Sequence, residues 1–279
     1  MSKGRPENPR LMNGFLLLGL LCFFIFFEIV YFGTFVFRNK KRNFTMHFRL
    51  KTTYSLLILV LFIFSSNGSA QNYRKVTFHQ IKSEGKIWGI DISHHQSTID
   101  WKKLKKQKPH FIFFKATEGA SHKDKKYTEN YKNARKQGII VGSYHFFSYR
   151  STGEAQANHF LKTARYKSGD LPLVLDAEYA SNMPSNKVVT KELTDFMKIV
   201  TRKTGKKPIV YCDYDYYKEY LDGNLKNKHY LWICDYRQKP DCDWTFWQTT
   251  DKFSISGVKG GVDFNLFNGT KSELEALLF

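Results

Sequence analysis

From residue 87 to residue 225 the chain alternates between short apolar runs and longer amphipathic stretches. The apolar runs are rich in β-branched and aromatic residues, which favours strands. Each run is followed by a stretch with apolar residues at helical spacing. The predicted strands are 87–93, 111–117, 139–147, 171–179 and 208–214. The predicted helices are 99–107, 127–137, 151–166, 187–204 and 216–225.

After residue 225 the helical pattern disappears. The segments 230–236, 243–249 and 261–267 are strand-like, and only short turns with Lys239-Pro240 and Gly260-Gly261 separate them. Five strand–helix units followed by three bare strands make eight strands, which suits closure into a barrel. The predicted fold class is therefore α/β, a TIM-like barrel with its catalytic residues at the C-terminal ends of the strands.

The first 70 residues have a different pattern. A nearly continuous apolar stretch, 11–37, is long enough to span a bilayer, although Glu28 interrupts it. Region 46–70 has the layout of a secretory signal, with a basic start at Met46, an apolar segment and small residues before Gln71. We favour a cleaved signal that starts at Met46. The alternative is that 11–37 remains as a membrane anchor.

Both alternatives place the folded part outside the cytoplasm, in the periplasm, in the cell envelope or in the medium. We expect a membrane or signal region at 1–70, a short spacer at 71–85 and one barrel domain at 86–279. Contact with a membrane is expected only through the N-terminal segment, if that segment is retained. We expect the protein to be a monomer.

The formal net charge of +19 bears on the partners that the chain could bind. A basic surface favours anionic polymers such as nucleic acid, lipid headgroups or cell wall, whereas the alternative is a solvated lysine face. The sequence has no zinc-finger, RNA-binding or Gly-rich phosphate motif, so a nucleic-acid partner is not expected.

Metal and disulfide chemistry also find little support. Three cysteines follow the N-terminal region, Cys212, Cys234 and Cys242. An odd number cannot form a closed disulfide framework, and the alternative is one bridged pair in an oxidising compartment. The adjacent His94 and His95 would point to opposite faces of an extended segment, which argues against joint ligation of a metal. We expect no metal and no cofactor.

The most informative candidate chemistry lies at the end of the fourth predicted strand. The run Leu171-Pro-Leu-Val-Leu-Asp-Ala-Glu-Tyr179 carries Asp176 and Glu178 two residues apart. Both side chains project from the same face of a strand. Two neighbouring carboxylates repel each other, which raises one pKa and leaves a proton donor beside an anion. Glycoside cleavage uses this combination, although an Asp-x-Glu after a strand can also mark a solvated loop.

Other predicted strands also end in polar and aromatic residues. The segment Gly89-Ile-Asp91-Ile-Ser93 ends the first strand, and Phe114-Lys115-Ala-Thr117-Glu118 ends the second. Carboxylates at the ends of several strands of one barrel predict a shared acidic cleft. Further polar and aromatic residues expected at strand ends are Tyr144, His145, Phe146, Tyr211, Asp213, Asp235, Tyr236, Trp247, Gln248 and Asp263.

At this point the sequence resembles glycoside hydrolase family 25, the Chalaropsis-type lysozymes or N-acetylmuramidases. The matching segments come in the family's order between residues 88 and 267. They are Gly-Ile-Asp-Ile-Ser-His-His-Gln, Ile-Asp-Trp, Phe-Phe-Lys-Ala-Thr-Glu-Gly, Gly-Ser-Tyr-His-Phe, Leu-Asp-Ala-Glu, Trp-Gln and Gly-Val-Asp-Phe-Asn. The resemblance implies a (β/α)5(β)3 barrel that binds peptidoglycan glycan strands. It also implies hydrolysis of the β-1,4 bond between N-acetylmuramic acid and N-acetylglucosamine.

The resemblance also implies roles for individual residues. Glu178 would act as general acid and then as base, and Asp176 would orient the substrate's 2-acetamido group for attack on the anomeric carbon. Asp91 would position substrate or tune Glu178. Asp263 would be a carboxylate at the rim of the site.

The remaining candidates are open between two interpretations. Tyr144, Phe146, Tyr211 and Trp247 are expected to bind sugar, or else to pack the top of the barrel. Gln248 is a candidate hydrogen-bond donor to sugar. His145 is expected to be part of the scaffold, and Glu118 to pair with Lys115. Two rival functions also remain: a non-catalytic glycan-binding module of the envelope, and a membrane-tethered structural protein.

Overall fold

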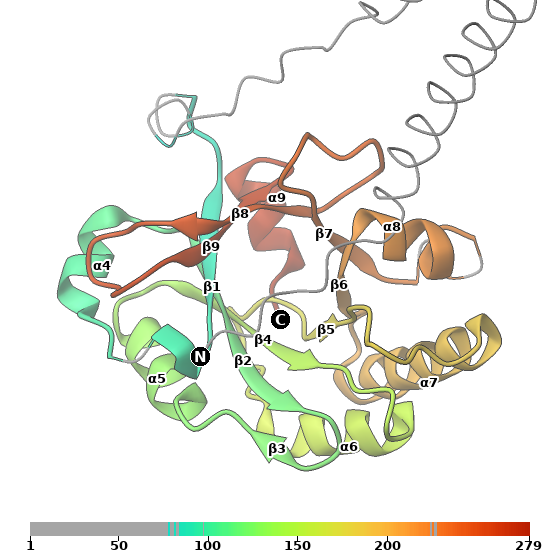
Figure 1. The fold of residues 1–279 in the computed structure, drawn as a ribbon. Coiled ribbons are helices and arrows are strands. Elements are labelled where there is room, and N and C mark those ends of the chain that lie inside the picture. The colour runs from blue at the N-terminus through green and yellow to red at the C-terminus, as the bar shows by residue number, and fades with distance from the viewer. Residues whose placement is uncertain (1–77, 79–80, 82–83, 97, 224, 226–227) are drawn as a thin grey trace, which may run out of the picture. The chain divides into compact units, whose positions relative to one another are not determined.

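The predicted barrel is present in a computed structural model, which describes residues 78, 81, 84–96, 98–223, 225 and 228–279. The strands run in the order β1-β9-β8-β7-β6-β5-β4-β2-β3, and β1 also pairs with β2, so eight of them close a ring (Figure 1). The strands are β1 (Trp88–Ile92), β2 (Phe111–Glu118), β3 (His122–Lys123), β4 (Ile140–Phe146), β5 (Val174–Asp176), β6 (Ile209–Asp213), β7 (Tyr230–Cys234), β8 (Phe246–Phe253) and β9 (Val262–Phe267).

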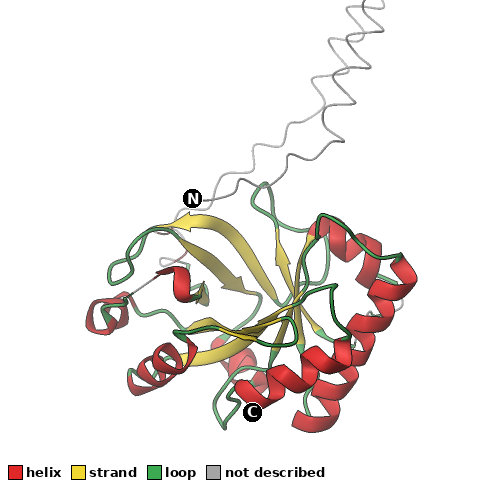
Figure 2. Ribbon diagram, turned by 60° about the horizontal axis from the view of Figure 1, so that its bottom comes forward, coloured by secondary structure: helices red, strands yellow, loops and turns green. Residues whose placement is uncertain are grey.

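Helices lie around the outside of the strands (Figure 2). They are α4 (Trp101–Gln107), α5 (Tyr127–Lys136), α6 (Gly153–Thr163), α7 (Asn186–Thr204), α8 (Tyr214–Tyr216) and α9 (Lys271–Leu277), with short turns η1 (His94–Gln96) and η2 (Tyr217–Leu221). The predicted helix 216–225 is thus a single turn followed by the π-helical η2. The prediction missed β3 and α9. With two residues, β3 is too short for a periodic signal.

The ring is parallel except at β9, which pairs antiparallel with both β8 and β1. A short connection between β8 and β9 explains this direction, because parallel neighbours need a long crossover and antiparallel neighbours do not. The other six junctions of the ring are parallel. Their C-terminal ends therefore meet at one end of the barrel.

Side chains alternate between the interior of the barrel and the layer beneath the helices. On β5, Val174 belongs to the inner apolar cluster and Leu175 to the outer one. Inside, Phe111 and Phe113 fill the space that Gly89 and Gly142 leave, since a Cβ on either glycine would collide with a phenylalanine ring. The interior is therefore packed, and a substrate can reach the barrel only at its mouth.

The predicted membrane and signal segments lie outside the described residues. Within the part that the structure describes, no helix is both long and apolar enough to cross a membrane. Two residues of the predicted spacer contact the barrel domain. Ile81 is buried in the outer cluster, and the ring of Phe78 lies 5.0 Å from that of Trp88 and 4.8 Å from that of Phe253.

Candidate active site

Asp176 is the last residue of β5, and its side chain follows Val174 into the barrel. It is 8% exposed, and its Oδ1 atom is buried without a hydrogen-bond partner among the described residues. Burial, and then the charge of Glu178, raise the pKa of Asp176 well above its usual value. Burial, a missing hydrogen-bond partner and a neighbouring carboxylate all favour the protonated form of an acid.

Glu178 lies two residues further along, beyond the end of β5, and is only partly buried. Ala177 between them belongs to the outer cluster, so the alternation of faces continues past the strand. The two carboxylates are therefore neighbours on the inner side, as the sequence predicts. Their electrostatic coupling raises the pKa of Asp176.

Asp91 sits across the mouth on β1 and belongs to a polar network that the structure resolves in detail. Its Oδ2 accepts hydrogen bonds from Asn265 Nδ2 at 2.8 Å and Gln248 Nε2 at 3.0 Å. Asp263 is its register partner on β9. Burial raises the pKa of Asp91, while hydrogen bonds with Asn265, Gln248 and Asp263 act in the opposite direction.

Gln248 is buried, and both ends of its amide are engaged by protein. Its Oε1 accepts from Tyr211 Oη at 2.9 Å and from Tyr236 Oη at 2.8 Å, while its Nε2 donates to Asp91. These bonds fix the amide's orientation. The structure thus shows Gln248 as a support for Asp91 and Tyr211.

Tyr144 is an aromatic candidate on which the charges of three of the acids act. It faces the barrel interior on β4 and packs against the inner cluster. Burial, and then the negative charges of Asp91, Asp176 and Asp263, raise the pKa of Tyr144 well above its usual value. Its hydroxyl therefore remains a proton-bearing donor beside the carboxylates.

A lysine lies among these acids. Lys115 Nζ donates to Glu118 Oε2 at 2.7 Å, which confirms the predicted pair, and lies 4.7 Å from the centre of the Phe146 ring. The positive charge of Lys115 lowers the pKa of Asp176 and partly opposes the effect of Glu178. Phe146 thus holds a cation in place at the mouth.

Trp247 is not brought into this group. It follows Phe246, an inner-cluster residue, and itself packs against the outer cluster. Its Nε1 donates to the backbone oxygen of Asp235 at 2.8 Å, and its ring lies 5.7 Å from that of Trp244. The side chain is therefore positioned as packing outside the barrel.

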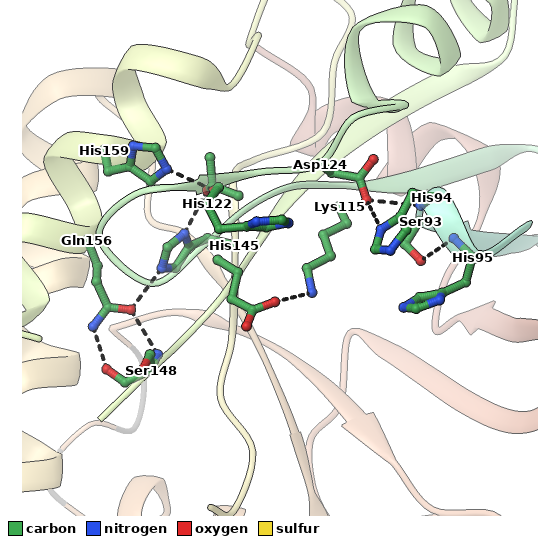
Figure 3. Close-up of polar contacts among 12 residues, drawn as sticks. Ser93, His94, His95, Lys115, His122, Asp124, His145, Ser148, Gln156 and His159 are labelled. Carbon is green, nitrogen blue, oxygen red and sulfur yellow. Dashed lines mark hydrogen bonds and ion pairs between the residues drawn. The ribbon is translucent and has the colours of Figure 1, made fainter. Parts of the chain in front are cut away.

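The rim beside β1 carries two histidines (Figure 3). His94 and His95 lie in η1 with their ring centres 4.1 Å apart, so the prediction that they point to opposite faces is wrong. That prediction assumed an extended segment, and the helical turn brings consecutive rings together. His94 Nδ1 pairs with Asp124 Oδ2 at 2.8 Å. The described residues contain no group of three or more acidic, histidine or cysteine side chains suited to a metal.

His145 lies on the outer side of β4, where its ring packs against Phe160 and Phe196, and Figure 3 shows it beside Gln156. Gln156 Nε2 donates to the backbone oxygens of Ser148 and Ser151, so Gln156 Oε1 is the acceptor for His145 Nε2 at 3.0 Å. Thr117 Oγ1 completes the ring's partners at 2.7 Å from Nδ1. Burial lowers the pKa of His145 to about 4. This neutral, fully bonded histidine confirms the predicted scaffold role.

Sequence reasoning missed the partners of Asp91. Asn265 Oδ1 accepts from Trp232 Nε1 at 2.8 Å while its Nδ2 donates to Asp91. The available signal was the spacing of Asp263 and Asn265, which puts both on the inner face of one strand. The link to Trp232 joins different strands, and no local pattern could have indicated it.

Comparison with known proteins decides the family. The model of "Glycosyl hydrolases family 25" matches residues 90–258. The chain belongs to this family. It is therefore a glycoside hydrolase, and its closed barrel with acids at the mouth agrees with the lysozyme-type chemistry that the sequence predicts.

The chain is also similar to individual curated proteins and solved structures. "Uncharacterized protein YegX" of Escherichia coli K12 is 39% identical over 69% of this chain and 73% of its own length. "Lysozyme M1" of Streptomyces globisporus is 32% identical over 68% of this chain and 71% of its own length. The solved structure of a family 25 glycosyl hydrolase from Bacillus anthracis has a TM-score of 0.67 at 32% identity, and covers 76% of this chain and 100% of its own.

Proposed function

We propose that this family 25 enzyme cleaves the β-1,4 bond between N-acetylmuramic acid and N-acetylglucosamine in peptidoglycan. The observation that carries the proposal is the buried Asp176 Oδ1, which lacks a hydrogen-bond partner among the described residues and lies beside Glu178. A buried acceptor without a partner costs about 1–3 kcal/mol. A substrate that supplies the missing donor recovers that free energy on binding.

The donor that fits is the N–H of the 2-acetamido group on the sugar at the cleaved bond. A hydrogen bond from this N–H favours the ionised form of Asp176. The proton that the raised pKa favours on free Asp176 would then pass to Glu178, which would give it to the leaving glycosidic oxygen. Substrate binding itself would thus prepare the general acid.

The proposed attacking group is the carbonyl oxygen of the same acetamido group. Asp176 and Glu178 lie on one side of one strand, whereas an inverting pair must flank the sugar and leave room for water between its members. Asp176 would orient the acetamido group, and Glu178, now deprotonated, would activate the water that opens the resulting ring. Asp91 and Asp263 would fix the far side of the mouth, and Tyr144 would donate to the bound sugar.

The direct test is digestion of purified peptidoglycan by residues 71–279, followed by mass spectrometry of the soluble fragments. We expect fragments with N-acetylmuramic acid at the reducing end. Fragments that end in N-acetylglucosamine would place the cut at the other glycosidic bond and contradict the proposal. Binding to the wall without release of fragments would favour the glycan-binding alternative.

We also propose that the enzyme is exported and that 86–279 acts as its catalytic domain, with 71–85 as a spacer. The support is the sequence of region 46–70, which has a basic start, an apolar segment and small residues before Gln71. N-terminal sequencing of the protein from its native host tests this. A start near Gln71 is expected, whereas a start upstream of residue 11 would favour the membrane anchor.

A further inference from the structure

A group of tyrosines lies next to the acid pair and has no part in the chemistry described above. Tyr179 directly follows Glu178 and is 43% exposed, which is unusual for a large apolar side chain in this protein. Tyr216 and Tyr220 lie under it, with ring centres 5.2 Å and 6.1 Å from its own. We call Tyr179, Tyr216, Tyr220 and Glu219 the Tyr179 platform.

The ring of Tyr179 is held in a fixed position. Its hydroxyl donates to Glu219 Oε2 at 2.7 Å, and its ring meets Tyr216 at an interplanar angle of 74°. Burial and the neighbouring Glu219 raise the pKa of Tyr179, so the hydroxyl keeps its proton and the bond persists at neutral pH. An exposed ring that is already immobile loses little conformational entropy when a ligand packs on it.

A second layer supports the platform. Tyr216 and Tyr220 have ring centres 4.5 Å apart, and the Tyr216 hydroxyl lies 2.5 Å from that of Tyr149. Asn186 Nδ2 donates to the backbone oxygen of Glu219 at 3.3 Å, which ties the start of α7 to η2. Contacts from α7, α8 and η2 thus hold the exposed Tyr179 ring in place.

The platform lies at the same end of the barrel as the acids. Tyr179 follows the C-terminal end of β5, and α8 and η2 follow the C-terminal end of β6. Tyr179 is the residue after Glu178, so the Cα atoms of the two are about 3.8 Å apart. By the same alternation of faces Tyr179 points outward from the barrel, over the outer-cluster residues Tyr216 and Tyr220. A polymer that leaves the mouth over the end of β5 would therefore pass across its exposed ring.

We infer that the Tyr179 platform is a separate sugar-binding subsite, which takes a pyranose ring of the same glycan strand beyond the cleaved bond. This inference rests on the proposed function, because it needs a glycan in the mouth. A pyranose presents a face of C–H groups that packs on an aromatic ring, and its hydroxyls bond to polar groups at the edge. Tyr179 supplies the ring and Glu219 the acceptor at its edge.

Binding, measured without turnover, tests the subsite. In a Glu178→Gln background, calorimetry would give the Kd for a disaccharide, a tetrasaccharide and a hexasaccharide of peptide-free peptidoglycan glycan. Tyr179→Ala should weaken the longer ligands by about five- to tenfold, as expected for loss of one aromatic contact, and leave the disaccharide unchanged. Tyr179→Phe keeps the ring and should retain most of the affinity.

Tyr230→Ala is the matched control, because this half-buried tyrosine begins β7 at the opposite end of the barrel. It should bind all three ligands as the background protein does. Equal affinity of Tyr179→Ala and its background for the hexasaccharide would overturn the subsite, and so would an equal loss for the disaccharide. Failure of the proposed cleavage would instead show in the wild-type digest, whatever these affinities are.

Discussion

Two neighbouring strands each bury a polar side chain, and they treat it in opposite ways. On β4, His145 is completely buried between the barrel and the helices, and both ring nitrogens have partners. On β5, Asp176 is almost as buried but faces the interior, and one of its oxygens has no partner in the described part of the chain. The strands are in register here, with His145 opposite Leu175 and Phe146 opposite Asp176.

The difference agrees with a scaffold role for His145 and with the catalytic role that we propose for Asp176. A buried polar group whose bonds are complete adds specificity to the fold and offers nothing to a ligand. A buried acceptor that the protein leaves unsatisfied lowers stability, and a ligand can satisfy it. Burial alone would not distinguish His145 from Asp176, because it shifts the pKa of each toward the neutral form.

The largest expected effect comes from Asp176→Asn. Turnover of peptidoglycan should fall by roughly 100-fold or more, because the amide cannot take the ionised form that orients the acetamido group. The thermal stability of the Asp176→Asn variant should instead be higher than that of wild type at neutral pH. The pKa of Asp176 is raised above 3.8 in the folded state. The stability that its protonated form contributes is complete below pH 3.8 and is lost as the pH rises through the folded-state pKa. At pH 7 the variant should therefore melt a few degrees higher than wild type, as measured by calorimetry.

The comparison can be sharpened by acidifying the protein. The pKa of His145 is lowered from 6.5 to about 4, so the folded state resists the proton that the unfolded state accepts. Stability from this group is complete above pH 6.5 and falls as pH drops toward 4, by about 3 kcal/mol in total. Denaturant titrations at several pH values would show it, and His145→Asn should remove most of the dependence. An equal acid sensitivity in the variant would contradict the assignment.

A smaller effect is expected at Asn265. Asn265→Ala removes a donor to Asp91, whose pKa should rise further because that bond lowers it. We expect kcat/KM to fall about tenfold and the acid limb of the pH–rate profile to move to higher pH. Trp232→Phe is the matched control, because it removes the indole donor to Asn265 and leaves the bond to Asp91. It should reduce stability without moving the limb.

The smallest effect on activity is expected at Trp247, which packs outside the barrel. Trp247→Phe loses the bond to the backbone oxygen of Asp235, and with it about 1 kcal/mol of stability. Its rate on peptidoglycan should match wild type within error. A tenfold rise in KM would show instead that this side chain binds sugar.

Much of this organisation could be predicted from the sequence, since it depends on local patterns. The apolar runs rich in β-branched and aromatic residues predicted the strands, and the Asp176–Glu178 spacing predicted the shared face of the two acids. Contacts between distant segments could not be predicted in this way. The bonds from Gln248 and Asn265 to Asp91 join residues 157 and 174 positions apart. The tilted contact between the rings of His94 and His95 depends on the helical turn η1, whereas the prediction from the sequence assumed an extended segment.

The sequence also leaves open which strand residues face the inside of the barrel and which face the helices. Trp247 and Gln248 are neighbours in the sequence, and a shift of one residue exchanges their faces. The sequence treated both as candidates for sugar binding. The structure places one in the outer packing and the other under Asp91.

The central claim is that the acids at the end of β5 perform the chemistry while the equally buried polar group on β4 does not. The most direct measurement compares the initial rates of peptidoglycan solubilisation by wild type, Glu178→Gln and His145→Asn, at a temperature where circular dichroism shows all three folded. Glu178→Gln should lose on the order of 10²–10⁴-fold in rate, and His145→Asn should keep most of it. A Glu178→Gln variant as active as wild type would contradict the account.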